Sequence, residues 1–150
     1  MKIRSMREDD IPNALDVVEG NYTHRNIGEM RRHLEEMFSR PARPHHPHYI
    51  VAERGTQIAG FGGYTVAQIG SGVYELFSVA VAPMYQKNGI GRALVTKLLD
   101  RIKAEEDNKA SIVLLTTDKP DFYRKFGFKT LRRFNSNGDS RKFLMALTLQ

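Results

Sequence analysis

A short glycine-containing turn runs directly into an amphipathic helix in the middle of the chain, with the sequence QKNGIGRALVTKLL at positions 86–99. Ser, Thr or Asp usually caps a helix, so capping alone does not require Gly89 and Gly91. Glycines are favoured where backbone N–H groups must approach a large partner, and the first turn of a helix offers free N–H donors beside its positive dipole end. The turn therefore predicts a phosphate-binding site.

Two common phosphate-binding motifs do not fit this turn. The third glycine of a G-x-G-x-x-G fingerprint would fall at Leu94, and the Gly-Lys-Ser/Thr of a P-loop is nowhere present. The turn instead reads Q-x-x-G-x-G from Gln86 to Gly91, directly after the apolar run VYELFSVAVAP at 73–83. A second segment with aromatic residues and a glycine, DFYRKFGF, follows at 121–128.

The elements that must position these segments follow from hydrophobic spacing and from turn residues. Their expected order is one strand, two helices, three antiparallel strands, a helix, a strand, a short helix and a final hairpin. The expected strands are 2–6, 49–53, 57–68, 73–83, 111–116, 128–134 and 142–149. The first helix is expected to start at Asp9 or Asp10, and the others to include 30–38, 90–102 and 118–126. A loop is expected at the proline-rich positions 40–48, and Asn137-Gly138 marks the last turn.

Together the two segments resemble the motifs of the GNAT acetyltransferase superfamily, whose F-Y-x-x-x-G-F signature matches the second segment. The element order agrees with that family over nearly the whole chain. The resemblance implies an α/β (α+β) fold with a mixed, mainly antiparallel sheet of six to seven strands and about four helices, splayed between strands 4 and 5. It also implies a single acetyl-CoA-dependent N-acetyltransferase domain over residues 1–150.

By this resemblance, acetyl-CoA binds in a gap between the fourth and fifth strands, which are expected to part near 79–82. Its pantetheine arm pairs with the fourth-strand backbone, and its pyrophosphate lies on the glycine turn, where each helix-dipole contact contributes roughly 0.3 to 1 kcal/mol. The implied cofactor-binding residues are Phe77, Val79, Ala80, Val81, Gln86, Lys87, Asn88, Gly89, Ile90, Gly91, Arg92 and Thr116. Family members more often carry arginine in place of Gln86, and many carry asparagine in place of Thr116.

The expected acceptor is an amine, and only its neutral form attacks the thioester. An alkylamine with a pKa of about 10.4 is neutral in about one molecule in 2,500 at pH 7, a deficit of roughly 4.6 kcal/mol. A base, a desolvating pocket or both must offset this deficit. Glu75 lies early on the fourth strand, where many members of the superfamily carry a catalytic glutamate, and it would act directly or through a water. The alternative is a strand glutamate that faces solvent.

Tyr123 resembles the family tyrosine that protonates or hydrogen-bonds the leaving thiolate. Transfer of its proton to a thiolate of pKa near 8.5 is uphill by about 2 kcal/mol, so hydrogen-bond donation is the simpler role, and core packing is the alternative. The N–H of Phe77 or Val79 would face the charge that grows on the carbonyl oxygen. The chain has no cysteine and no G-x-S-x-G elbow, so direct attack in a ternary complex is expected.

Composition sets the remaining limits. A chain of 150 residues that is 41% hydrophobic suits one globular domain, and the absence of cysteine excludes disulfides and thiolate metal sites. No apolar signal segment or long apolar run is present, so a cytoplasmic protein without a membrane span is expected. The net charge of +6 favours an anionic partner, but the basic residues are scattered without a nucleic-acid motif. Two non-enzymatic alternatives stay open: a regulatory acyl-CoA-binding domain and a basic module that docks on nucleic acid.

The histidines at 45, 46 and 48 lie among prolines, without cysteine and without the i, i+4 spacing of a helical metal site. A solvated loop is favoured, and no metal is expected. This loop and the helix that includes 30–38 are expected to form the acceptor wall, so His24, His45 and Tyr49 are candidates to touch the acceptor. The sequence does not rank small-molecule and protein amines, and it leaves a homodimer open.

Overall fold

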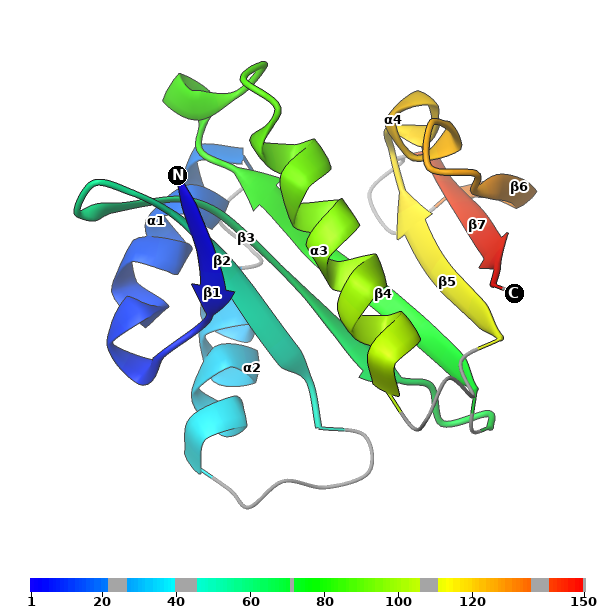
Figure 1. Ribbon diagram of the computed structural model, residues 1–150, viewed down its shortest axis with the longest axis horizontal. Coiled ribbons are helices and arrows are strands. Elements are labelled where there is room, and N and C mark those ends of the chain that lie inside the picture. The colour runs from blue at the N-terminus through cyan, green and yellow to red at the C-terminus, as the bar shows by residue number, and fades with distance from the viewer. Residues whose placement is uncertain (22–26, 40–45, 71, 106–110, 136–140, 150) are drawn as a thin grey trace.

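The computed structural model describes residues 1–21, 27–39, 46–70, 72–105, 111–135 and 141–149. These residues form a seven-stranded sheet of order β1-β2-β3-β4-β5-β7-β6, with helices on both faces (Figure 1). The strands are β1 (Lys2–Ser5), β2 (His48–Arg54), β3 (Gln57–Val66), β4 (Val73–Val81), β5 (Ile112–Thr117), β6 (Lys129–Asn135) and β7 (Arg141–Thr148). The helices are α1 (Ile11–Asn21), α2 (Ile27–Ser39), α3 (Ile90–Ala104) and α4 (Pro120–Arg124), with 3-10 turns η1 (Glu8–Asp10) and η3 (Pro83–Tyr85). The expected fold class is confirmed.

Two hydrophobic cores hold the helices on the sheet. The apolar stripe of α3 lies over β2, β3 and β4, and α1 with α2 beside it covers the opposite face (Figure 1). Leu94, Leu98 and Ile102 of that stripe are fully buried, as their helical spacing predicted. Of the helices described, none is long and apolar enough to cross a membrane. The turn expected at Asn137-Gly138 and most of the proline-rich loop lie outside the described residues.

The β4 and β5 strands pair in parallel over three residue pairs only, from Val73↔Ile112 to Glu75↔Leu114. They lie together there and diverge toward the end where α3 begins and α4 lies (Figure 1). Beyond this point β5 continues to pair with β7 as far as Thr117. The expected splay is confirmed, but the strands part directly after Glu75 rather than near 79–82.

A β-bulge in β4 gives a physical reason for this early separation. The register between β3 and β4 shifts by one residue at Ser78, whose backbone is left-handed with a φ of 57°. In a regular strand Leu76 and Ala80 would face the same side, yet Leu76 lies in the core beneath α3 and Ala80 lies in the core beneath α1. Because a bulge bends and twists its strand, it turns β4 away from β5. The sequence indicated one uninterrupted strand here.

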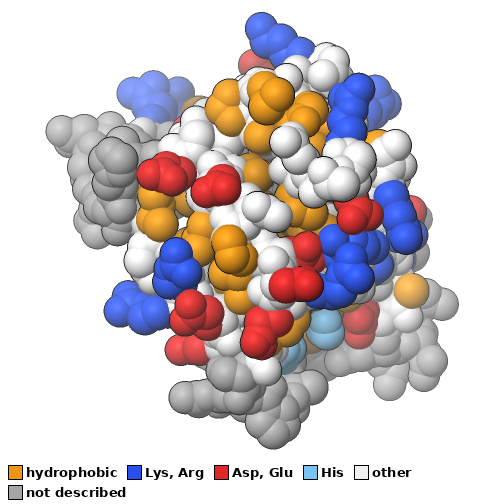
Figure 2. Space-filling model, turned by 90° about the vertical axis from the view of Figure 1, so that its left-hand side faces the viewer, with side chains coloured by type: hydrophobic (Ala, Val, Ile, Leu, Met, Phe, Trp, Pro, Cys, Tyr) orange, Lys and Arg blue, Asp and Glu red, His pale blue; other side chains and the backbone are white. Residues whose placement is uncertain are grey.

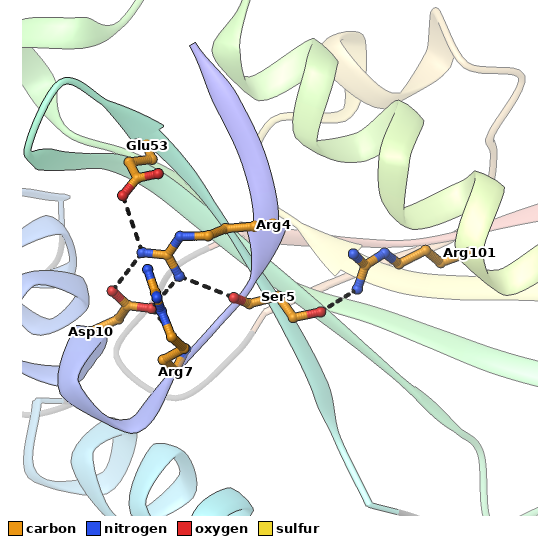
Figure 3. A network of polar contacts seen from close by, with 6 residues as sticks. All are labelled: Arg4, Ser5, Arg7, Asp10, Glu53 and Arg101. Atoms are coloured by element: carbon orange, nitrogen blue, oxygen red, sulfur yellow. Dashed lines mark hydrogen bonds and ion pairs between the residues drawn. The ribbon is translucent and has the colours of Figure 1, made fainter.

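A polar network fastens β1 to the start of the first helix (Figure 3). The guanidinium of Arg4 donates to both carboxylate oxygens of Asp10, at 2.7 and 2.9 Å, and also reaches Glu53 of β2 at 3.4 Å. Asp10 is only 6% exposed and accepts the backbone N–H of Arg7 at 2.7 Å. The aspartate expected to cap the helix therefore reaches back to the residue before η1, and Arg4 links it to β1 and β2.

Asp10→Asn is expected to lower the free energy of unfolding by about 2 to 4 kcal/mol at pH 7, because it leaves Arg4 with a weaker partner. The hydrogen bond from Arg4 is the main cause that lowers the pKa of Asp10 below its ordinary value of 3.8. A lowered pKa stabilises the folded state above the ordinary value and loses that contribution as pH falls through the lowered value. Urea unfolding should therefore show that the variant and the unmodified chain differ less in their free energy of unfolding at about pH 3 than at pH 7.

The control for this variant is Glu35→Gln, which breaks an exposed pair with Arg31 and should change stability by less than about 1 kcal/mol. If Asp10→Asn lowered the free energy of unfolding by the same amount at both pH values, the ion-pair explanation would be contradicted.

Candidate active site

The turn before α3 presents a set of free backbone donors. Gly89 caps the helix with a left-handed φ of 81°, and Lys87 is also left-handed at 65°. The first helical hydrogen bond runs from the N–H of Ala93 to the carbonyl of Gly89, at 3.0 Å. The N–H groups of Ile90, Gly91 and Arg92 come before this bond in the first turn of α3, so they have no partner within the helix. A concave run of unpaired N–H groups at the positive end of a helix is a site for an anion.

The surroundings of the turn also suit an anion. A Cβ built on Gly89 meets nothing within 4 Å, so the space in front of the turn is open. Lys87 and Arg92 are exposed on either side of it and carry positive charge. A left-handed backbone at Lys87 costs roughly 1 to 2 kcal/mol, and such strain is concentrated at functional sites. All three residues were expected at the phosphate site from the sequence.

The side chain of Gln86 forms local hydrogen bonds at the start of the turn. Its side-chain amide donates to the carbonyl of Val81 and to the side-chain oxygen of Asn21, both at 2.9 Å. The Asn21 amide in turn donates to the same Val81 carbonyl, and the Gln86 N–H donates to Pro83. In this arrangement Gln86 anchors the turn to the end of β4 and to α1, with its donors engaged there. No sequence pattern indicated a role for Asn21.

The two motifs found in the sequence meet where α4 packs against α3. A Cβ at Gly91 would lie 3.4 Å from the ring of Phe122, so this glycine also permits the close approach of α4. The Phe122 ring packs edge-on against Tyr123 at 4.9 Å, and Tyr123 packs against Phe128 at 5.8 Å. Tyr123 is 9% exposed, so it contributes to the core between Phe122 and Phe128.

A cavity of about 840 Å³ lies on the opposite face of the sheet, between α2 and β4. Glu75, Phe77 and Ser78 line it from β4, and Glu29, His33 and Glu36 line it from α2. Glu75 is exposed and occupies the last position at which β4 and β5 pair, so it lies at the point where the two strands part. A carboxylate at this position can accept a proton from a molecule held in the cavity.

Tyr49 contacts the two β4 residues at the bulge, Phe77 and Ser78. It lines the same cavity, is 2% exposed and hydrogen-bonds with the side chain of Ser78, while its ring packs edge-on against Phe77 at 5.5 Å. Burial raises the pKa of Tyr49 to about 12, and the hydrogen bond with Ser78 acts in the opposite direction. The phenol therefore stays protonated at neutral pH. A Cβ at Gly63 would lie 2.9 Å from the Tyr49 ring, which explains the glycine at that position.

Comparison with known proteins identifies this arrangement. The model of the Acetyltransferase (GNAT) family matches residues 13–128. The chain belongs to this family. The family is one of acetyltransferases, so the expected enzyme class, with acetyl-CoA as cosubstrate, is confirmed at the level of the family.

One curated relative and two solved structures illustrate the similarity of this GNAT chain to known proteins. N-alpha-acetyltransferase RimI of Mycobacterium tuberculosis is 31% identical over 102 residues, which span 61% of this chain and 58% of that protein. A GNAT-family crystal structure from Desulfovibrio desulfuricans has a TM-score of 0.86 at 21% identity and covers 98% of both chains. An aminoglycoside 6'-N-acetyltransferase in complex with coenzyme A has a TM-score of 0.72 at 20% identity, covering 99% of this chain and 97% of that one.

The other expected cofactor residues of this GNAT chain lie along the diverging strands. Val79, Ala80 and Val81 follow the last β4–β5 pair, so β5 does not pair with their backbone. Thr116 is exposed on β5, opposite Leu144 of β7. Contact between these residues and acetyl-CoA stays a prediction.

The two histidines expected near the acceptor, His24 and His45, lie outside the described residues. Of the other two histidines of the proline-rich segment, His46 lines the cavity, and His48 stacks on Tyr64 with ring centroids 5.0 Å apart. Within the part of the chain that the structure describes, no group of three His, Asp or Glu side chains is placed to hold a metal ion.

Proposed function

We propose that this chain transfers an acetyl group from acetyl-CoA to an amine by direct attack in a ternary complex. The observation that carries the proposal is the parting of β4 and β5 directly after Glu75. It leaves β4 backbone unpaired by β5 between the first turn of α3 and the cavity that Glu75 lines. Acetyl-CoA and the acceptor amine can therefore approach β4 from different sides.

Each residue has a role in this proposal. The N–H groups of 87–92 hold the pyrophosphate, and the backbone of 79–81 pairs with the pantetheine arm. The N–H of Phe77 or Val79, beside the bulge, stabilises the charge on the carbonyl oxygen. Glu75 accepts the proton of the attacking amine, directly or through water. As the amine nitrogen bonds to the acetyl carbon and the carbon–sulfur bond breaks, Tyr123 donates a hydrogen bond to the departing thiolate.

The two non-enzymatic alternatives fit the structure less well. A regulatory acyl-CoA-binding domain needs no acceptor cavity, yet a cavity lies beside the bulge with a carboxylate in it. A nucleic-acid module needs a basic surface, but the face that carries β1, α1 and α2 shows acidic and basic side chains interspersed (Figure 2).

Calorimetric titration with acetyl-CoA, followed by an amine screen that measures thiol release, tests the proposed function. Saturable binding with one site per chain and amine-dependent thiol release are expected. Binding without release from any amine would favour the regulatory domain. Absence of binding by folded protein, together with salt-dependent nucleic-acid binding, would favour the basic module.

Tyr123→Phe is expected to lower turnover about ten- to a hundredfold, because it removes one hydrogen bond to a charged leaving group. The affinity for acetyl-CoA should change less than twofold, since the ring and its packing are retained. Steady-state thiol release and calorimetry measure the two quantities. Tyr64→Phe is the matched control: it removes a buried hydroxyl that donates to Glu105 at 2.8 Å, away from the proposed site. Unchanged turnover in Tyr123→Phe would leave this residue with a packing role.

A cytoplasmic location and a homodimer stay predictions from the sequence. Cell fractionation checks the first, and light scattering during size-exclusion chromatography checks the second.

A further inference from the structure

Two side-chain amides converge on one backbone carbonyl at the end of β4. The amide of Asn21, the last residue of α1, donates to the carbonyl oxygen of Val81 at 2.9 Å, and the amide of Gln86 donates to the same oxygen at 2.9 Å. Gln86 also donates to the side-chain oxygen of Asn21 at 2.9 Å. A carbonyl oxygen has two lone pairs, so these bonds occupy both of them on Val81.

The Val81 carbonyl faces the edge of β4 from which β5 has diverged. In an antiparallel ladder, successive residues direct their N–H and C=O groups to opposite edges of the strand. The N–H of Ala82 donates to the carbonyl of Ala59 at 2.8 Å, so the polar backbone groups of Val81 point away from β3. β5 does not pair with Val81, because the last pair between the two strands is Glu75↔Leu114. Under the proposed function, the pantetheine arm lies along this edge.

The two amides therefore act on the surface that acetyl-CoA would meet. An amide of the pantetheine arm cannot donate to the Val81 carbonyl, since its lone pairs are already used, and must donate to another carbonyl of β4. The amides also compensate the partial negative charge of this oxygen at the end of the strand that leads to the anion site. The same hydrogen bonds fix where Gln86 begins the glycine turn relative to β4.

The end of α1 is packed against the segment that joins β4 to the glycine turn. A Cβ built on Gly20 would lie 2.9 Å from the ring of Pro83, so a larger residue would displace this contact. Pro83 opens η3, the 3-10 turn that leads from β4 to Gln86. Asn21 uses its second amide N–H on the carbonyl of Val17 at 2.8 Å, which fixes the orientation of its side chain on the helix. Helix α1 thus contacts this connection both by packing and by hydrogen bonds.

We propose that Asn21 is a positioning residue for acetyl-CoA, which fixes the spacing between the open edge of β4 and the glycine turn. This inference rests on the proposed function, in which the pantetheine arm binds the strand and the pyrophosphate binds the turn. Two contacts on one ligand reinforce each other only where their spacing matches that of the two sites. Asn21 maintains that spacing through Gln86 and Val81 rather than through contact with the ligand.

The test compares one ligand that spans strand and turn with one that reaches only the turn. Acetyl-CoA is the first, and adenosine 3′,5′-bisphosphate, which lacks the pantetheine arm, is the second. Asn21→Leu keeps a side chain of similar size and removes the amide. Calorimetric titration is expected to show a Kd for acetyl-CoA raised about tenfold or more, while the Kd for the bisphosphate stays within about twofold. General destabilisation would raise both Kd values by the same factor.

Two further variants complete the test. Asn13→Leu replaces an exposed asparagine of the same helix and should change neither Kd. Gln86→Leu breaks the same hydrogen bonds from the exposed side of the turn, so it provides the test if Asn21→Leu does not fold. It should also weaken acetyl-CoA binding and not bisphosphate binding. If Gln86 bound the pyrophosphate directly, its loss would weaken both, and the positioning explanation would be overturned.

Failure of this inference would look different from failure of the proposed function. An unmodified, folded chain that does not bind acetyl-CoA contradicts the proposed function. If the unmodified chain binds acetyl-CoA and Asn21→Leu binds it equally well, or loses affinity for both ligands by the same factor, only the positioning role of Asn21 is contradicted.

Discussion

Gly89→Asp is expected to raise the Kd for acetyl-CoA about a hundredfold, because it places a carboxylate where the pyrophosphate should lie. Two unit charges about 4 Å apart repel by about 4 kcal/mol in partly screened surroundings, which exceeds the 2.7 kcal/mol of a hundredfold change. Asp tolerates the left-handed backbone better than most residues, and a Cβ at this position meets nothing within 4 Å. The fold should therefore persist. Calorimetric titration measures the affinity.

Gly55→Asp is the matched control. Gly55 is also left-handed, with a φ of 63°, and a Cβ there also meets nothing within 4 Å, but it lies in the β2–β3 turn. It should bind acetyl-CoA like the unmodified chain. Gly89→Asn has nearly the same shape without the charge, so it separates repulsion from bulk. Acetyl-CoA binding by Gly89→Asp within threefold of normal would contradict the anion site.

Glu75→Gln is expected to lower turnover about a hundredfold or more at pH 7 while the Kd for acetyl-CoA stays within twofold, because it removes the proposed base and leaves the glycine turn intact. The neutral fraction of an alkylamine rises about tenfold per pH unit below its pKa of about 10.4. The need for a base therefore falls as pH rises. The ratio of the turnover of the unmodified chain to that of the variant should fall between about pH 7 and pH 9.5.

Glu19→Gln, which removes an exposed carboxylate on α1 outside the cavity lining, is the control and should keep normal turnover. A deficit in Glu75→Gln that is the same at every pH would indicate a structural role. Normal turnover at pH 7 would leave Glu75 as a strand residue that faces solvent.

The features that local sequence determines were predictable. The stripe of Leu94, Leu98 and Ile102 follows from a 3.6-residue period, and the glycine turn follows from the type of backbone it must adopt. Gly89 is left-handed and caps α3 as that interpretation requires. The proximity of Phe122 to Gly91 was not predicted, because the two segments are about thirty positions apart in the chain.

The features that depend on pairing and packing were not predictable from one sequence. The bulge at Ser78 is a one-residue mismatch between β3 and β4, and neither strand alone contains it. The anchoring role of Gln86 depends on Asn21, which α1 brings to the end of β4. That part of the polar face of α2 lines a cavity could not be predicted, because the cavity also depends on the position of β4.

The three ladder pairs between β4 and β5 also bear on the cohesion of the molecule. They are the only ladder pairs that join β1–β4 to β5–β7 among the described residues. The N–H groups of Ser111 and Ile112 also donate to the carbonyl of Gly72, and the side chains beneath α3 supply a further link. Under the proposed function, acetyl-CoA binds between β4 and β5 where they diverge, so it would contact both parts of the sheet. At a concentration one hundred times its Kd it would add about 2.7 kcal/mol to the stability of the folded state. Acetyl-CoA would thus also stabilise the fold. Without it, local unfolding would begin with the separation of β4 from β5.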